Sequence, residues 1–159
     1  MLSLPPLIEE DIQCIESSLD ELLRKSDATS ALLIDKGGPL ISQRGELEGL
    51  DTTTMAALAA GSFAATEAIA GLVGETNFSS VYQQGEHQSL WVGNIGTQLL
   101  LIVIFKEGVS VGAVKYFAAT TIQRITVQML RAKMRDPGAK VDLVSLNLTD
   151  TAGFFRKKA

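Results

Sequence analysis

The sequence predicts an α/β sandwich in which a five-stranded antiparallel sheet is covered on both faces by three helices. Apolar patterns follow one another in the order α-β-β-α-β-β-β-α. Consecutive strands are separated by tight turns, which makes neighbouring strands antiparallel. One strand is apolar on both of its faces and therefore needs cover on both sides. The 159 residues suit one domain with a single continuous core.

The first helix is predicted to start near Leu7, after the two prolines at positions 5 and 6. Its apolar residues recur every three or four positions and form one stripe, as in an amphipathic helix. We expect its acidic residues to form a solvent-exposed face; they are Glu9, Glu10, Asp11, Glu16, Asp20 and Glu21. Residues 31–35 and 40–44 then form a hairpin, in which Gly37 and Gly38 supply the positive φ angles of the turn.

A middle helix is predicted from Thr52 to Val73, with Asp51 as its N-cap and Gly74 just beyond its end. The helix contains no Lys or Arg, and Glu67 is its one acidic residue. Small residues fill most of the remaining positions. A helix that faces water normally carries charge on its outer side, so both sides of this one are expected to contact protein. From composition alone, a core helix within a monomer explains the pattern equally well.

Three strands are predicted over residues 78–83, 89–92 and 98–105, and the last of them is the strand that is apolar on both faces. A final helix runs from Val111 or Gly112 to Met134 and stops at the Asp-Pro-Gly sequence that follows. We therefore assign residues 7–135 to one domain and residues 136–159 to a C-terminal tail that is loosely ordered or docks on a partner.

Composition excludes several classes of function. A net charge of −4 argues against nucleic-acid binding, because phosphate contacts need clustered Lys and Arg. With one cysteine and one histidine, most metal sites and catalytic pairs are not available, and we expect no metal or cofactor. No P-loop pattern occurs. The apolar strip Leu99 to Phe105 is too short to cross a membrane, and without an export signal the protein is expected in the cytoplasm.

The order of these segments resembles the roadblock (dynein light chain) superfamily, and most of all its bacterial MglB-type members. Seven segments carry the resemblance: Ala31 to Gly38, Leu40 to Ser42, Leu50 to Gly61, Ala64 to Thr66, Leu72 to Glu75, Gln84 to Glu86 and Leu101 to Phe105. The resemblance covers roughly residues 8 to 130. It implies a roadblock/profilin-like fold, and we expect the middle helix on one face of the sheet and the other two helices on the opposite face.

The resemblance also implies a homodimer in which the middle helices pack together and the strand after each helix pairs with its twin. Carried onto this chain, the dimer interface comprises Met55, Leu58, Ala59, Ser62, Ala65, Ile69, Phe78, Ser80 and Tyr82. MglB-type dimers bind one small Ras-like (MglA-like) GTPase and stimulate GTP hydrolysis in bacterial polarity or motility. The corresponding GTPase-binding residues are Thr53, Thr54, Ala57, Ala60, Gly61 and Ala64.

These expectations describe a binding protein without catalytic residues of its own. The middle helix contains no arginine finger, and Arg44 and Lys36 in the hairpin are interpreted as solvated charges. The protein would then act by remodelling the switch regions of the GTPase. One alternative is a roadblock-type scaffold that binds a GTPase or motor complex without altering hydrolysis. A second is a small-molecule sensor or enzyme on a similar sheet, which a buried polar pocket would favour.

Overall fold

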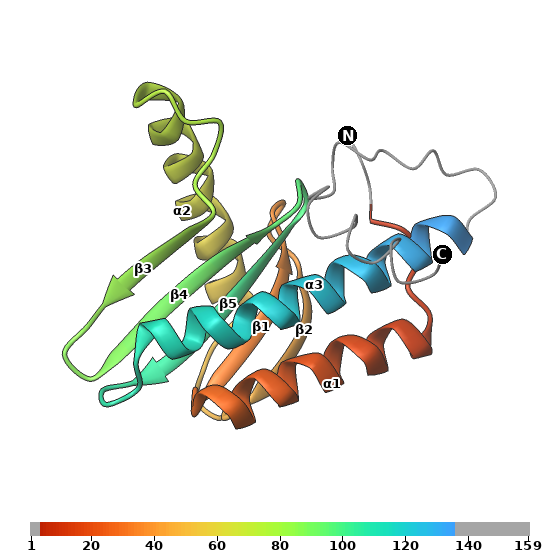
Figure 1. Ribbon diagram of the computed structural model, residues 1–159, viewed down its shortest axis with the longest axis horizontal. Helices are drawn as coiled ribbons and strands as arrows, with labels where there is room; N and C mark the ends of the chain where they lie inside the picture. The colour runs from red at the N-terminus through yellow and green to blue at the C-terminus, as the bar shows by residue number, and fades with distance from the viewer. Residues whose placement is uncertain (1–3, 136–159) are drawn as a thin grey trace.

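The computed structural model describes residues 4–135 as three layers, with one five-stranded sheet between helices (Figure 1). The predicted order of elements is confirmed. The helices are α1 (Glu9–Ser26), α2 (Thr52–Leu72) and α3 (Val111–Arg135); the strands are β1 (Ser30–Asp35), β2 (Leu40–Gly45), β3 (Ser80–Gln84), β4 (Gln88–Ile95) and β5 (Leu99–Lys106). The tail predicted for residues 136–159 lies outside the described residues.

The strands follow the spatial order β2-β1-β5-β4-β3, and every neighbouring pair is antiparallel. β5 lies at the centre, and its seven residues from Leu99 to Phe105 are all buried, as its continuous apolar pattern predicts. β4 is longer than its apolar residues suggest, because the ladder with β5 continues to the Ile95–Leu99 pair through Gly93 and Asn94. Sheet hydrogen bonding thus outweighs the weak strand preference of these two residues.

Alternation along the strands divides the core into two clusters. Leu33, Leu101 and Val103 point toward α1 and α3, which together cover one face of the sheet. Leu32, Leu100 and Ile102 point toward α2, which covers the other face alone. The expected distribution of one helix and two helices over the two faces is therefore confirmed.

Two details of the predicted local structure are wrong. In the β1–β2 turn only Gly38 has a positive φ (122°); the backbone N–H of Gly37 instead donates to Asp35 Oδ1 at 2.7 Å. Asp11 does not belong to a solvent-exposed acidic face, because its side chain is fully buried between α1 and α3. It accepts hydrogen bonds from Gln128 and Arg135, which are more than 110 residues away in the sequence and so could not be paired with it from the helical pattern.

The indole ring of Trp91 covers Gly93 on the α1–α3 face of β4. A Cβ atom at residue 93 would lie 2.3 Å from the Trp91 ring. We therefore expect Gly93→Ala to lower the free energy of unfolding by about 1–3 kcal/mol through overpacking. Urea unfolding followed by the fluorescence of this single tryptophan measures the change.

Gly71→Ala in α2 is the matched control, since a Cβ atom there has no neighbour within 4 Å. In a helix this change is expected to be neutral or to stabilise by up to about 1 kcal/mol. An unfolding midpoint for Gly93→Ala equal to that of the wild type would show that the ring does not pack on the glycine.

Candidate protein-interaction site

The start of α2 is held by the predicted N-cap. Asp51 Oδ1 accepts a hydrogen bond from the backbone N–H of Thr54 at 3.1 Å, and Asp51 Oδ2 accepts one from the Thr54 hydroxyl at 2.6 Å. These two hydrogen bonds hold the pKa of Asp51 below its usual value. The carboxylate is therefore engaged in capping the helix.

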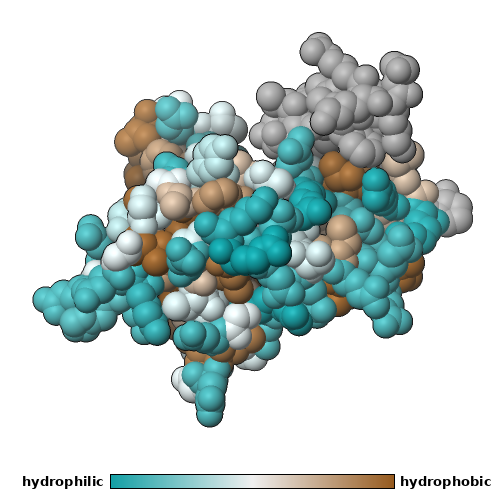
Figure 2. Space-filling model, turned by 60° about the horizontal axis from the view of Figure 1, so that its bottom comes forward, coloured by the Kyte–Doolittle hydropathy of each residue, from teal (hydrophilic) through white to brown (hydrophobic). Residues whose placement is uncertain are grey.

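Most of the surface of α2 is exposed. Ala56, Ala60, Phe63 and Ala70 are its buried residues, and the first three form a stripe at i, i+4 and i+7 against the sheet. Large apolar side chains remain in water on the other sides: Leu58 is 68% exposed, Ile69 53% and Leu72 88%. Figure 2 shows hydrophobic residues at its upper left, where α2 protrudes. α2 therefore has apolar residues on several sides, and only the side with Ala56, Ala60 and Phe63 packs on the sheet.

Its length and composition also make α2 the one helix in residues 4–135 that could cross a membrane by those criteria alone. The seven-residue strip from Leu99 to Phe105 is therefore not the longest apolar segment of the chain. The same composition suits a helix that packs one side on a sheet and offers its other sides to protein. The packing of Ala56, Ala60 and Phe63 on the sheet favours this second explanation.

The second half of α2 is anchored to the β1–β2 turn by an ion pair. Lys36 Nζ lies 2.8 Å from Glu67 Oε1, 3.5 Å from the carbonyl oxygen of Gly96 and 5.5 Å from the centre of the Phe63 ring. Lys36 is therefore not the solvated charge expected from the sequence. Glu67, the single acidic residue of α2, therefore holds the helix against the β1–β2 turn of the same chain. The other exposed residues of α2 carry no charge.

A groove of about 490 Å³ runs between α2 and the outer strands β3 and β4. It exists because α2 packs over β1 and β2 and leaves the α2-facing side of β3 and β4 uncovered. Its walls are mainly apolar; those from α2 include Met55, Leu58, Ala59 and Ser62, and those from the strands are Val81, Gln83, Leu90 and Val92. Asp51 is its one ionisable residue, and that carboxylate is already hydrogen-bonded to Thr54.

β3 forms the edge of the sheet beside this groove. Within the described residues it pairs with β4 alone, so one row of its backbone N–H and C=O groups has no strand partner. The strand has neither of the usual protections against pairing, because it contains no charged residue and no proline. An apolar groove and an open strand edge therefore lie next to each other on one surface.

The structure brings four predicted dimer-interface residues together in the groove: Met55, Leu58, Ala59 and Ser62. Ala65 and Ile69 are exposed farther along α2, while Phe78 and Ser80 are half-buried. The Tyr82 ring stacks on Phe105 at 6.0 Å between ring centres, on the opposite face of the sheet. Its neighbours Val81 and Gln83 line the groove and were missed, although strand alternation from Tyr82 would have found them.

One predicted GTPase-binding residue is misplaced. Ala60 is 6% exposed and packs on the sheet, so it is not available to a partner. The other five predicted residues are exposed: Thr53, Thr54, Ala57, Gly61 and Ala64. Every position of α2 except Glu67 is either small or apolar, so the sequence contains little contrast from which to decide which side faces the sheet.

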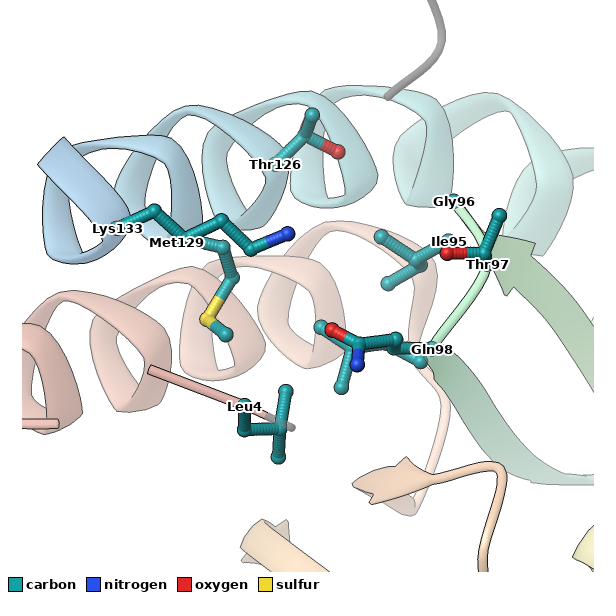
Figure 3. Close-up of a pocket in the computed structure, with 9 residues that line it drawn as sticks. Leu4, Ile95, Gly96, Thr97, Gln98, Thr126, Met129 and Lys133 are labelled. Carbon is teal, nitrogen blue, oxygen red and sulfur yellow. The ribbon is translucent and has the colours of Figure 1, made fainter. Parts of the chain in front are cut away.

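A second, much smaller pocket lies between the N-terminal segment, α3 and the β4–β5 turn (Figure 3). Leu4, Met129 and Lys133 line one side of it, and the turn residues Gly96 and Thr97 line the other. Its volume of about 30 Å³ holds one or two water molecules and no larger ligand. It does not supply the buried polar pocket that a small-molecule sensor or enzyme would need.

Comparison with known proteins now decides the family. The family model described as the Roadblock/LC7 domain matches residues 15–105, which include most of α1, all of α2 and all five strands except the last residue of β5. The chain belongs to the roadblock/LC7 family.

Solved structures place this roadblock chain near MglB. Myxococcus xanthus MglB is 31% identical with a TM-score of 0.77, over 86% of this chain and 99% of that one. An MglB structure described as having a tetrameric arrangement is 30% identical with a TM-score of 0.77, over 83% and 99%. The gliding protein MglB from Thermus thermophilus is 30% identical with a TM-score of 0.75, over 82% and 99%.

A more distant likeness confirms the profilin-like fold. Acanthamoeba castellanii profilin II is 16% identical with a TM-score of 0.53, over 71% of this chain and 97% of that one. No curated protein matches the sequence. The roadblock family and the MglB-like fold thus rest on the family model and on the solved structures.

Proposed function

We propose that this roadblock protein forms a homodimer through α2 and the free edge of β3, and that the dimer binds one small Ras-like GTPase of the MglA-like kind. In this proposal it stimulates GTP hydrolysis by remodelling the switch regions of the GTPase. It contributes no catalytic residue and acts in the cytoplasm. The observation that carries the proposal is the uncharged, exposed surface of α2 beside an apolar groove and an unpaired strand.

In this proposal the outer surface of α2 is divided between two partners. Met55, Leu58, Ala59 and Ser62 face the groove and are assigned to the second copy, together with Ala65, Ile69 and the segment from Phe78 to Tyr82. Thr53, Ala57, Gly61 and Ala64 lie on the outer side, and with Thr54 they are assigned to the GTPase. Similarity to MglB, including a structure described as tetrameric and another described as a gliding protein, supports self-association and a role in bacterial polarity or motility.

The proposal is tested by measuring GTP turnover. A small Ras-like GTPase from the same organism is loaded with GTP and assayed for binding and for phosphate release with and without this protein. We expect the dimer to accelerate hydrolysis in proportion to the complex formed, with saturation at one GTPase per two chains. Binding at that ratio without acceleration would support the scaffold function instead, and absence of binding in either nucleotide state would contradict both.

A related prediction concerns Arg44, the hairpin arginine nearest in sequence to α2. Its guanidinium donates two hydrogen bonds of 2.9 Å to Asp20, and its side chain is 41% exposed, so it is a solvated charge that also forms an ion pair at the surface. This pair joins β2 to α1, on the face of the sheet opposite α2. We expect Arg44→Ala to leave stimulation of GTP hydrolysis within a few-fold of the wild type.

A loss of about 1000-fold in the same phosphate-release assay would instead identify Arg44 as an arginine finger supplied to the GTPase. Asp20→Asn is the matched control, because it removes the same ion pair and keeps the arginine. Equal small effects of both variants would show that the pair only joins α1 to β2.

A further inference from the structure

Glu67 is the one charged residue of α2, and it lies on the side of the helix that faces the sheet. The buried residues of that side are Ala56, Ala60, Phe63 and Ala70. Position 67 continues their spacing, four residues after Phe63 and three before Ala70. An apolar residue would be favoured on the packed side of an otherwise uncharged helix, so the carboxylate at this position needs a separate explanation.

Lys36 meets this carboxylate from a position that the fold holds firmly. Its backbone N–H donates to the carbonyl oxygen of Gln98 at 2.8 Å, which joins the β1–β2 turn to the β4–β5 turn. Its Nζ atom donates to Glu67 Oε1 and to the carbonyl oxygen of Gly96, and it lies over the ring of Phe63. The side chains of Lys36 and Glu67 are 19% and 35% exposed, so salt screens this pair less than a fully exposed one. The contact therefore fixes one point of α2 relative to two turns of the sheet.

Apolar packing by itself does not determine which side of α2 faces the sheet. On the opposite side the large exposed residues are Leu58, Ile69 and Leu72. They have the same spacing as Ala56, Glu67 and Ala70, shifted by two positions, which is about 200° around the helix. The buried side contains one large apolar residue, Phe63. A helix rotated about its own axis would still present apolar side chains to the sheet, but it would separate Glu67 from Lys36.

We propose that the Lys36–Glu67 ion pair sets the rotation of α2 about its axis and thereby positions the GTPase-binding surface. Rotation away from the observed arrangement would leave a partly buried lysine without its anion, which is unfavourable. The proposed contact residues Ala57, Gly61 and Ala64 have no flexible side chains that could adapt to a misplaced partner, so the placement of the helix backbone decides the fit. The inference rests on the proposed GTPase binding and gives a role in it to two residues outside the assigned contact surface.

The decisive variant removes both charges at once. Lys36→Met combined with Glu67→Leu leaves no charge unpaired, and replacing a partly buried ion pair with apolar side chains is often neutral or stabilising. A role in stability alone predicts normal GTPase binding for a variant whose urea midpoint is unchanged or higher. The positioning role predicts the same midpoint together with a GTPase affinity lowered about 10-fold or more.

Arg124→Met combined with Glu21→Leu is the matched control. This change also removes one ion pair that joins two elements, but the pair links α3 to α1 on the face of the sheet opposite α2. We expect it to leave the GTPase affinity unchanged.

Thiol labelling measures the rotation of α2 without a GTPase. In a Cys14→Ser background, a cysteine is placed either at Ala70, which is fully buried, or at Ala68, which is exposed. With the ion pair intact, maleimide should react about 10-fold or more faster in the Ala68→Cys chain than in the Ala70→Cys chain. Addition of Lys36→Met and Glu67→Leu should bring the two rates close together, because α2 no longer keeps one side against the sheet.

The outcomes separate this inference from the proposed function. If the doubly substituted chain keeps the labelling contrast, or loses it and still binds the GTPase normally, the positioning role is wrong and the proposed function stands. A clearly lowered urea midpoint would show that the pair acts through stability, which also contradicts the inference. An unsubstituted chain that binds no GTPase would contradict the proposed function and the positioning role together.

Discussion

Leu58→Asp is expected to convert the proposed dimer to a monomer and to abolish the proposed stimulation of GTP hydrolysis. The side chain lines the groove and is 68% exposed in the single chain, so the substitution costs little in folding. In the dimer the same carboxylate would be desolvated among Met55, Val81 and Leu90 with no cation to pair with. Such a group costs several kcal/mol, and each 1.4 kcal/mol weakens association tenfold.

Sedimentation over a range of concentrations measures this effect, and the dissociation constant should rise at least 100-fold. Phosphate release by the GTPase, measured in parallel, should fall to its unstimulated rate. Met134→Asp is the matched control, since Met134 is 66% exposed and lies at the far end of α3. Should the Leu58 variant remain dimeric and active, the groove would not be the interface and another surface would have to join the two copies.

Asp11→Ala is expected to produce the largest loss of folding stability among the polar substitutions. One oxygen of the Asp11 carboxylate accepts hydrogen bonds from Gln128 at 2.6 Å and Arg135 at 2.9 Å, and the other accepts from the backbone N–H of Ile8 and again from Arg135. Alanine would leave the buried Gln128 amide without an acceptor and would separate the start of α1 from the end of α3. We expect a loss of about 3 kcal/mol, measured by urea unfolding.

The same carboxylate makes stability depend on pH. Arg135, which donates two hydrogen bonds, is the main cause that holds the pKa of Asp11 well below its usual value, and the bonds from Ile8 and Gln128 add to this effect against the opposing effect of burial. A depressed pKa in the folded state stabilises the protein above the unfolded-state pKa. That contribution is lost as the pH falls below about 4 toward the folded-state value.

Asp11→Asn isolates this contribution, because asparagine cannot ionise. The difference in unfolding free energy between wild type and Asp11→Asn should be constant near neutral pH and should shrink progressively below about pH 4. Glu9→Gln, at an exposed position in the same turn of α1, is the control for removing one negative charge from that turn. A difference that stayed constant down to about pH 2 would mean that the ionised form of Asp11 is not preferentially stabilised by the fold.

The sequence by itself determined the order of the elements, the antiparallel sheet, the central position of β5 and the caps of α2. Each depends on local physics: side-chain periodicity, turn residues, or a carboxylate placed to accept helix N–H groups. It also identified α2 as a helix with too little charge for a fully solvated surface. These features follow from composition and spacing over a few residues, which a single sequence displays directly.

The tertiary structure alone decided how these elements use their side chains. Ala60 faces the sheet and Ala57 faces water, although the two residues are chemically identical and lie on one helix. The groove forms because α2 packs toward β1 and β2, and Asp11 is buried because Gln128 and Arg135 approach it from α3. Such outcomes depend on contacts between residues far apart in the chain, and short-range periodicity carries no information about them.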